Sequence, residues 1–375
     1  MVEYTKHELK DVCKRLSSGK GISSKLIGEK GLYPVYGGNG IRGYTEHSNF
    51  SGDCAIIGRQ GAFCGNVRYF KGEAYMTEHA VVVCADDFNN THYLSYLLST
   101  MNLGRLSGQS AQPGLSVKTL GIQEIMLPPL EYQYKVVALL NSLDEKIAIN
   151  EKINDNLQQQ AELLYHERFE TVDRDKLPVG WRIVRLGDVA TISKKSFNPA
   201  KEPEMLLEHY SIPAFDEAHF PVFEPSTAIK SNKFIVDDSC FMISKLNPTT
   251  KRVWKPYCLT ENAVCSTEFI VYKAKSQEIT DFLYSVIDSA SFSDFMCSHV
   301  TGSTGSRQRT TPSDTLAFEL VLPNAEEIAE YQGIVSPMFE QIKCNATEND
   351  RLKRLRDSLL PKLMSGEIDV SGIQL

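Results

Sequence analysis

The chain has 375 residues, a formal net charge of −7 and 42% hydrophobic residues, which is ordinary for a globular protein of two or three domains. No apolar run approaches the roughly 20 residues that a membrane helix needs. The charged start, Met1 to Lys6, is not followed by the apolar core of a signal peptide. The nine cysteines contain no C-x-x-C spacing, which argues against a zinc site or a disulfide framework and predicts reduced thiols in a cytoplasmic protein.

The charge is distributed unevenly along the chain. Residues 1–80 contain 11 Lys and Arg against 8 Asp and Glu, whereas residues 123–175 contain 5 against 11 and residues 324–375 contain 6 against 9. Most of the acidity therefore lies in these two later segments. The remaining segments are neutral to slightly basic, which permits a local basic surface despite the negative total.

The first 125 residues are predicted to form a domain rich in strands and turns. The patterns predict a strand and glycine-rich turn over 32–44, a hairpin made of 53–58 and 66–70, a buried strand over 77–84 and a short helix over 91–100. Pro128-Pro129 then interrupts the chain.

A long helix is predicted from about Glu131 to Arg168. Its apolar or asparagine residues recur at alternating spacings of four and three for about four heptads, which is the signature of a coiled coil. The central residues of this predicted seam are Leu143, Ile147, Asn150, Asn154 and Leu157.

The same seam returns 195 residues later without a gap. The matching central residues are Ile342, Asn345, Asn349 and Leu352. If a pseudo-twofold axis relates two antiparallel helices, Asn150 faces Asn349, Asn154 faces Asn345, Ile147 faces Leu352 and Leu157 faces Ile342. The same register places Arg356 opposite Leu143. Buried asparagines in such a seam usually specify register and orientation.

Residues 181–322 repeat the first domain loosely. Leu9-Lys-Asp-Val matches Leu186-Gly-Asp-Val at an offset of 177, and Thr77-Glu78 matches Thr267-Glu268 at 190. The rising offset indicates insertions in the second copy. We therefore predict an α+β tandem repeat in which two similar globular domains are separated by two long antiparallel helices that form a coiled coil. The predicted segments are domain 1–125, helix 126–172, domain 173–322, and helix and tail 323–375.

The segment from Gly38 to Gly43 spells G-x-G-x-x-G. A dinucleotide site of this kind needs a helix to begin at the glycines. The residues that follow, Tyr44 to Asn49, are rich in turn formers and lack helical periodicity. A glycine-rich turn is the favoured interpretation, and a nucleotide-binding enzyme is kept as an alternative.

No catalytic motif is apparent in the sequence. We find neither a Walker phosphate loop nor the Asn-Pro-Pro-aromatic motif of amino-methyltransferases, and no Ser/His/Asp set can be assigned. His79 follows Glu78, but the second copy has Phe269 at the matching position, which favours a packing role for the histidine.

Basic and amide residues, interleaved with aromatics, lie on the predicted loops of both domains. Arg and Lys suit phosphates and guanine edges, and Asn and Gln suit adenine edges. The candidate DNA-binding residues in the first domain are Asn39, Arg42, Tyr44, Arg59, Gln60, Arg68 and Lys71; those in the second are Lys194, Lys195, Lys245, Asn247, Lys251, Arg252, Trp254, Lys255, Arg307, Gln308 and Arg309. Gln109 and Gln112 lie in a matching loop before the first helix. Each of these residues is also compatible with an ordinary solvated surface.

Taken together, these features resemble a specificity subunit of a type I DNA restriction–modification system. The resemblance rests on the two-copy plan, the Leu127-Pro-Pro-Leu130 lead-in followed by the helix with Asn150 and Asn154, the tail from Leu359 to Ile368, and the stretch from Tyr33 to Tyr44. It implies two target-recognition domains that each read one half of a split DNA site, with the helices fixing the spacing.

The resemblance also implies partners and cofactors that this chain does not itself supply. Two methyltransferase (modification) subunits would bring S-adenosylmethionine and methylate adenine N6 in each half-site. Restriction subunits would add translocation and cleavage driven by ATP and Mg. The partners expected are therefore double-stranded DNA and these subunits, with no membrane. A coiled-coil adaptor with two protein-interaction domains is the main alternative.

Overall fold

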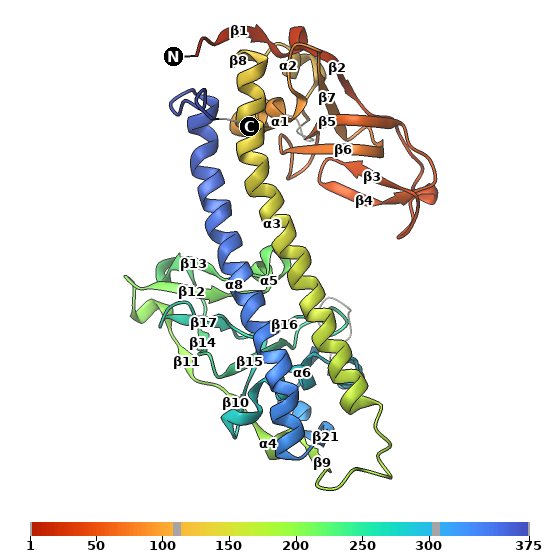
Figure 1. Cartoon of the computed structure of the whole chain (residues 1–375), viewed down its shortest axis with the longest axis vertical. Helices are drawn as coiled ribbons and strands as arrows, with labels where there is room; N and C mark the ends of the chain where they lie inside the picture. Colours follow the sequence, from red (N-terminus) through yellow and green to blue (C-terminus); the bar gives the residue numbers. More distant parts are fainter. Residues whose placement is uncertain (1, 108–113, 302–307, 374–375) are drawn as a thin grey trace. The chain divides into compact units, whose positions relative to one another are not determined.

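The computed structural model describes residues 2–107, 114–301 and 308–373. The chain divides into two compact units, one formed by Met1–Lys146 with Arg351–Leu375 and the other by Ile147–Asp350. Two long helices, α3 (Leu130–Tyr165) and α8 (Ala325–Met364), each contribute to both units (Figure 1). The units therefore cut across the four predicted segments, because each unit combines a sheet domain with part of both helices.

The first unit is built on a six-stranded sheet with the order β2-β7-β5-β6-β3-β4. The predicted hairpin is present and longer than expected, since β5 pairs antiparallel with β6 from Phe50–Ala74 to Ile57–Val67. A separate pair, β1 with β8, closes the domain. The strands are β1 (Thr5–Glu8), β2 (Cys13–Ser18), β3 (Tyr33–Gly37), β4 (Gly40–Thr45), β5 (Phe50–Gly58), β6 (Val67–Met76), β7 (Ala80–Ala85) and β8 (Glu124–Leu127), and the short helices are α1 (Thr91–Thr100) and α2 (Val117–Gly121).

Alternation along β5 and β7 gives this sheet a core on each face. Ala55 and Ile57 point to a core that includes α1 and the nearby parts of α3 and α8, whereas Cys54 and Ile56 point to a smaller core beneath Phe50. Helix α1 matches the predicted span and is capped by the preceding residue, Asn90, whose side chain accepts a hydrogen bond from the backbone N–H of Tyr93.

Within the first unit, Asp144 of α3 connects three helices. Its carboxylate accepts a hydrogen bond from the hydroxyl of Tyr96 in α1 at 2.6 Å. The same carboxylate forms an ion pair with the guanidinium of Arg356 in α8 at 2.7 Å. Arg356, which the sequence placed opposite Leu143, thus has a carboxylate partner at the next residue. The basic side chain is accommodated in the helix pair because its charge is paired.

The second unit contains two main sheets. One has the order β10-β18-β15-β16 and the other β11-β14-β17-β12-β13. The strands are β9 (Arg182–Arg185), β10 (Ala190–Ser193), β11 (Ser196–Phe197), β12 (Leu206–Tyr210), β13 (Val222–Pro225), β14 (Lys233–Ile235), β15 (Cys240–Ser244), β16 (Val253–Trp254), β17 (Ala263–Ser266), β18 (Phe269–Ala274), β19 (Val300–Thr301), β20 (Arg309–Thr310) and β21 (Glu319–Leu322); the helices are α4 (Leu186–Val189), α5 (Ile212–Ala218), α6 (Thr280–Asp288) and α7 (Ala290–Ser298).

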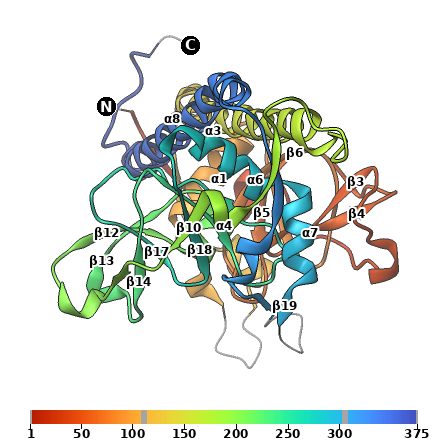
Figure 2. The same cartoon turned by 90° about the horizontal axis from the view of Figure 1, so that it is seen from below.

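Helix α6 lies between the four-stranded sheet and the helix pair of this unit (Figure 2). Aromatic side chains fill the interface. Phe282 of α6 lies 5.9 Å from Tyr165 of α3 and 6.3 Å from Tyr331 of α8, measured between ring centroids. The hydroxyl of Tyr331 donates to Ser285 at 2.8 Å, so the buried phenol is satisfied.

The two domains share one topology, as the sequence repeat predicts. The order β2-β7-β5-β6 in the first corresponds to β10-β18-β15-β16 in the second, with antiparallel pairing throughout. The β1–β8 pair corresponds to β9–β21. The five-stranded sheet, built largely from residues 196–235, lies where the rising offset indicated inserted residues. The fold is thus an α+β tandem repeat with long antiparallel helices.

The helices of the second unit pair through a layer of asparagines. Asn150 donates to the amide oxygen of Asn349 at 2.8 Å, and Asn345 donates to that of Asn154 at 2.8 Å. These are the two pairs expected from the pseudo-twofold register. Ile147 is 6% exposed, and the other apolar residues of the predicted seam, Leu143, Leu157, Ile342 and Leu352, are half-buried.

None of the helices in the described part of the chain is long and apolar enough to cross a membrane.

Candidate nucleic-acid interface

The glycine-rich segment of the first domain forms a β-hairpin. Gly38 and Asn39 are the two turn residues between β3 and β4, and Gly37 pairs with Gly40 across the turn. Gly40 has φ +101°, a conformation that a residue with a Cβ rarely adopts. The residues after the turn continue as strand β4 to Thr45. The helix that a dinucleotide site requires is therefore replaced by a strand, and the nucleotide-binding alternative is wrong for this motif.

Two arginines lie against the glycines of this hairpin. A Cβ added at Gly40 would lie 2.7 Å from a terminal nitrogen of Arg68, and one added at Gly37 would lie 2.6 Å from Cδ of Arg42. Both arginine residues are exposed. In the described part of the chain, no hydrogen bond or ion pair is found for either guanidinium. Their donors are therefore available to an external acceptor.

The tip of the hairpin packs against the ends of β5 and β7. A Cβ added at Gly38 would lie 3.1 Å from the carbonyl oxygen of His79 and 3.5 Å from that of Gln60. The side chains of Gln60 and His79 are hydrogen-bonded at 3.1 Å. Arg59 donates at 3.5 Å to the hydroxyl of Ser18. The structure thus brings Asn39, Arg42, Arg59, Gln60 and Arg68 around one hairpin tip, and adds His79 to them.

The sequence favours a packing role for His79 because the second copy has Phe269 at the matching position. Its side chain is 39% exposed, and its Nε2 atom lies 3.3 Å from the carboxylate of Glu78. The tip position follows from the pairing of β5 with β7, which the local sequence does not reveal. His79 therefore lies at the hairpin tip, beside Gln60, and not within a hydrophobic core.

Two further candidates of the first domain lie apart from this tip. Lys71 pairs with Asp53 in the β5–β6 ladder, three residues along β6 from Arg68. An odd spacing on a strand places the two side chains on opposite faces. Tyr44 lies at the far end of β4, where its backbone pairs with Gly28, and is 36% exposed.

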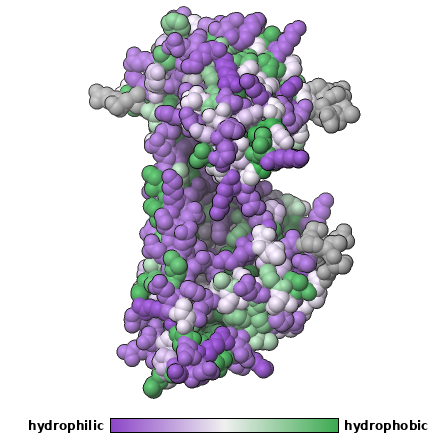
Figure 3. All heavy atoms as spheres, turned by 90° about the vertical axis from the view of Figure 1, so that its right-hand side faces the viewer, coloured by the Kyte–Doolittle hydropathy of each residue, from purple (hydrophilic) through white to green (hydrophobic). Residues whose placement is uncertain are grey.

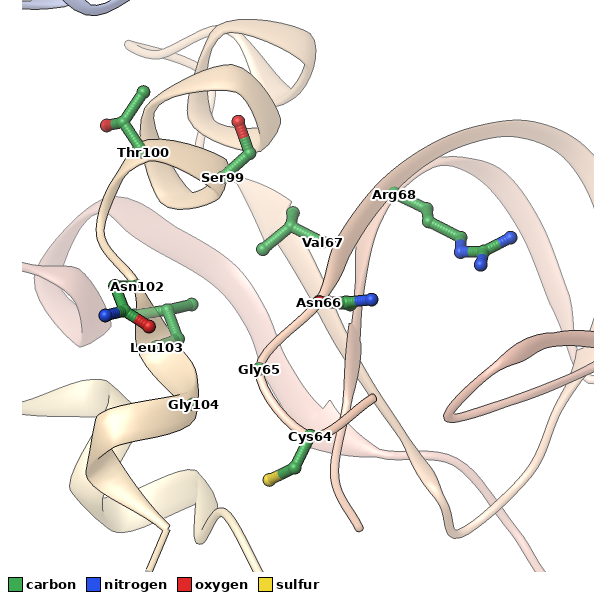
Figure 4. A pocket seen from close by; sticks show the side chains of 10 residues that line it. All are labelled: Cys64, Gly65, Asn66, Val67, Arg68, Ser99, Thr100, Asn102, Leu103 and Gly104. Atoms are coloured by element: carbon green, nitrogen blue, oxygen red, sulfur yellow. The ribbon is translucent and has the colours of Figure 1, made fainter. Parts of the chain in front are cut away.

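A polar hollow of about 560 Å³ adjoins Arg68. Figure 4 shows Asn66 and Arg68 on one side and Ser99, Thr100 and Asn102 on the other. A Cβ added at Gly65 would lie 2.1 Å from the backbone nitrogen of Gly104, so the chain segments meet closely at its base. The candidate interface therefore continues from Arg68 towards the end of α1.

The candidate cations of the second domain are largely engaged within the protein. Arg252 makes two bonds to Asp216, at 2.6 and 2.9 Å, and Lys255 pairs with Asp281 of α6. The pKa of Arg309 is raised because its guanidinium donates to Glu268 at 3.0 Å. Such pairs neutralise charge that an incoming phosphate would otherwise meet.

Lys251 has the most extensive set of acidic partners in this group. Its ammonium lies 2.5 Å from Glu162 of α3 and 2.9 Å from Asp288 of α6. Burial lowers its pKa, but the two carboxylates outweigh burial and the net pKa is raised. In the structure Lys251, Arg252 and Lys255 therefore link the β15–β16 segment to its surroundings, and their role in DNA binding stays a prediction.

The prediction for Trp254, by contrast, is corrected. It is 1% exposed and packs edge-on against Tyr210 with 4.7 Å between ring centroids. A side chain so buried offers no face for a base to stack on. Alternation along the short strand β16 turns it into the core, although a basic sequence surrounds it.

The remaining candidates of the second domain lie on loops. Lys194 and Lys195 are exposed between β10 and β11. Lys245 donates to the carbonyl of Thr267 at 2.8 Å, and the backbone N–H of Asn247 donates to the carbonyl of Gln308 at 3.0 Å. Arg307, Gln109 and Gln112 lie outside the described residues. Hydrophilic side chains cover much of the face seen in Figure 3.

Metal-binding side chains do not gather in this region. Across residues 2–107, 114–301 and 308–373, no group of three or more His, Cys, Asp or Glu side chains is arranged to hold a metal ion. The groups at the hairpin tip are guanidinium, amide and imidazole donors. They suit recognition of phosphates and base edges.

Known proteins resemble this chain in sequence and in fold. Residues 1–159 match the family model described as the type I restriction modification DNA specificity domain. The type I restriction enzyme EcoprrI specificity subunit of Escherichia coli is 40% identical over 147 residues, which cover 38% of this chain and 36% of that protein. The MjaIX specificity subunit of Methanocaldococcus jannaschii is 27% identical over 313 residues, which cover 76% of this chain and 70% of that protein.

A solved structure is similar along almost the whole chain. The crystal structure of the type I restriction–modification system S subunit from M. genitalium has a TM-score of 0.63 and 16% identity, with 96% of each chain covered. At this identity the likeness concerns the fold. The chain therefore resembles type I restriction–modification specificity subunits, in sequence most clearly over residues 1–159 and in fold along almost its whole length.

Proposed function

We propose that this chain is the sequence-specific DNA-recognition subunit of a type I restriction–modification complex. Each domain reads one half of a bipartite site, and the chain positions methyltransferase subunits for adenine N6 methylation. The observation that carries the proposal is the repeated topology, in which β2-β7-β5-β6 and β10-β18-β15-β16 form two copies of one domain. Two similar readers in one chain suit a target with two half-sites.

The hairpin tip supplies the chemistry for the first half-site. Arg42 and Arg68 present guanidiniums beside Asn39 and Gln60, and the close approach of the glycines determines where the arginine stems lie. Arginine binds the O6 and N7 atoms of guanine with two hydrogen bonds, and asparagine or glutamine binds adenine similarly. We assign base-edge recognition to this tip and phosphate contacts to the exposed Lys194 and Lys195 of the second domain.

Helices α3 and α8 serve in this proposal as the spacer between half-sites. Their asparagine layer supports the role, because reciprocal amide bonds are satisfied in one register and broken by a slip. A spacer that does not slip keeps the number of unread base pairs constant.

The modification subunits would dock on the helices. Ile149 and Ile153 of α3 are 53% and 40% exposed and lie four residues apart, so they share one helix face in the second unit. The modification subunits would carry S-adenosylmethionine and flip the target adenine out of the duplex. Restriction subunits would carry ATP and Mg, and the assembly would act on DNA in the cytoplasm.

Selection from a pool of randomised duplexes tests the proposal. The chain, assembled with the modification subunits of its system, is expected to enrich a split motif, and its affinity should fall as salt rises because phosphate contacts release counterions. Replacing residues 1–125 by the corresponding domain of another specificity subunit should change one half of the motif. Enrichment of no sequence by an assembled complex would favour the adaptor alternative.

Docking is tested separately. The double variant I149E/I153E should weaken assembly with the modification subunits, whereas I149L/I153L should assemble normally. Charged side chains on an apolar contact must be desolvated without a partner. Unchanged assembly of the glutamate variant would remove this helix face from the proposal.

A further inference from the structure

Two cysteines of the first domain lie directly opposite each other on neighbouring strands. Strand β5 pairs antiparallel with β7 in the register Ala55–Val83 and Ile56–Val82, without irregularity. One residue further along, the same register sets Cys54 against Cys84. Residues that face each other across a ladder have side chains on the same face of the sheet.

The hydrogen bonds of the ladder define the kind of pair that the cysteines form. Arg59 donates its backbone N–H to the carbonyl of His79, its opposite residue, at 3.0 Å, whereas Gly58 donates on the other side, at 2.9 Å, to the carbonyl of Asn66, which directly precedes β6. The backbone N–H and C=O groups of successive residues point alternately to the two sides of a strand. Cys54 lies four residues before Gly58, so its N–H and C=O groups also point towards β6 and not towards β7. Cys54 and Cys84 are therefore a non-hydrogen-bonded pair.

This kind of pair has the spacing that a disulfide needs. Facing residues in it have Cα atoms about 4.5 Å apart and are the closer of the two kinds of antiparallel pair. Disulfides span Cα separations of about 4.4–6.8 Å. A bond between the two sulfurs thus requires no separation or slippage of β5 and β7.

Cys54 and Cys84 lie in a core of their own, which the nearby thiol of Cys13 does not reach. Cys54 and Cys84 are 0% and 4% exposed and belong to one small core beneath Phe50. Cys13, on the adjacent strand β2, packs against the core on the opposite face of the sheet. The sheet therefore lies between Cys13 and the pair, although β2 and β7 are neighbours.

We propose that Cys54 and Cys84 are an oxidisable dithiol that forms a cross-strand disulfide with a low-molecular-weight disulfide as oxidant. The thiolate of Cys84 attacks one sulfur of the oxidant, which forms a mixed disulfide and releases one small thiolate. The thiolate of Cys54 then attacks the Cys84 sulfur and releases the second. Two protein thiols are oxidised and the oxidant is reduced to two small thiols, whose thiolates take up, by way of solvent, the two protons that the cysteines lose.

The order of attack follows from the charges nearby. Arg15 pairs with Cys84 across β2 and β7, and its guanidinium lies 5.4 Å from the ring centroid of Phe50, on the face of the cysteines. Burial raises the pKa of both thiols, that of Cys54 to about 12, and Arg15 opposes the rise at both; Lys14 opposes it further at Cys84. Cys84 is the more exposed and the better stabilised thiolate, so it reacts first.

Peptide mapping of the full-length chain tests the site. Cleavage after Lys and Arg releases Cys54 in residues 43–59, Cys84 in residues 72–105 and Cys13 in residues 11–14, each with one cysteine. The folded chain is treated with cystamine, remaining thiols are blocked with N-ethylmaleimide, and the digest is analysed without reductant. The expected product joins 43–59 to 72–105, lighter by two hydrogens than the two peptides together, in the wild type and in C13S.

Variants and stability complete the test. C54S should leave Cys84 as a cysteamine mixed disulfide, and C84S should leave Cys54 unmodified. The oxidised wild type should unfold at a higher urea concentration than the reduced form, and dithiothreitol should reverse the shift, because the bond restricts the unfolded chain. The contradicting result is that the peptides of Cys54 and Cys84 are recovered separately, each blocked by N-ethylmaleimide, while the exposed Cys344 carries cysteamine. The oxidant was then active, and the proposal is overturned.

Discussion

The side chain of Asn150 donates a hydrogen bond to the amide oxygen of Asn349 at 2.8 Å, and the same nitrogen lies 2.7 Å from a carboxylate oxygen of Glu348. Asn345 and Asn154 form the companion pair at 2.8 Å. Three of the four asparagines are no more than 6% exposed. Because amides buried in a helix seam need partners, only a register that pairs them is favourable.

Replacing one of these asparagines should destabilise the chain. In N150L, Asn349 loses its donor and Glu348 loses a charge-assisted bond, so the free energy of unfolding should fall by about 1–3 kcal/mol. Urea unfolding followed by circular dichroism measures the change.

A matched double variant separates polarity from packing. N150L/N349L leaves neither amide unpaired, so it should recover much of the loss and at the same time relax the register. The exposed I149L is the control for substitution on the same helix. Equal destabilisation in single and double variants would contradict the reciprocal bond.

The two arginines at the hairpin tip should determine part of the first half-site. R42Q and R68Q remove bidentate donors, so each should cost about 1–3 kcal/mol at one base pair of the site. Binding of the assembled complex to the selected duplex and to its single-base variants measures this loss.

K71Q is the control for charge in the same domain, because Lys71 lies on the opposite face of β6 from Arg68. K71Q should reduce the binding free energy by less than R42Q or R68Q does, and by the same amount for every duplex sequence. If R42Q and R68Q weaken all duplexes equally, the arginines contact phosphates and base recognition lies elsewhere.

Lys251 should support the fold rather than DNA binding. K251M leaves the carboxylates of Glu162 and Asp288 without their cation, and breaking a buried pair costs about 3–5 kcal/mol, less here because Lys251 and Glu162 are partly exposed. Urea unfolding should show the loss.

K194Q provides the contrasting variant, since Lys194 is exposed. The K194Q variant should be as stable as the wild type and should bind duplex DNA more weakly. The slope of its log affinity against log salt concentration should be shallower by about the amount of one phosphate contact. Normal stability in K251M together with lost DNA affinity would restore Lys251 to the interface.

Asp288 should make stability depend on pH. Burial raises its pKa to about 7, and Lys251 only partly opposes the rise. Between about pH 4 and 7 the folded chain therefore holds a proton that the unfolded chain has released, so this group's contribution to stability falls as pH rises through that range and is constant above it.

Comparison with D288N isolates this effect, because asparagine has no proton to lose. The difference in unfolding free energy between wild type and D288N should change across pH 4–7 and remain level at higher pH. A difference that stays constant from pH 4 to 7 would show that Asp288 is already ionised at pH 4.

The helical part of the fold could be predicted because its information is local and repeated. Once an antiparallel pairing about a pseudo-twofold axis is assumed, the recurrence of Asn150 and Asn154 as Asn345 and Asn349 gives the residue pairs, and the structure confirms both pairs. Helix α1 likewise occupies its predicted span, since the Asn90 cap and the apolar run lie next to each other.

The candidate site was harder to predict because its residues depend on partners remote in sequence. Lys251 is neutralised by Glu162, 89 residues away, and Arg252 by Asp216, 36 residues away. Trp254 lies in a basic stretch whose strand turns it inward. His79 reaches the hairpin tip through the β5–β7 pairing, which no nearby motif signals.

The most direct test of DNA recognition by two domains is to map N6-methyladenine across a genome in cells that express this chain with the modification subunits of its system. The account predicts a split motif with one methylated adenine in each half, absent when the chain is omitted, and altered in one half when residues 1–125 are exchanged. Methylation that is unchanged without the chain, or a motif in which both halves change on that exchange, would contradict it.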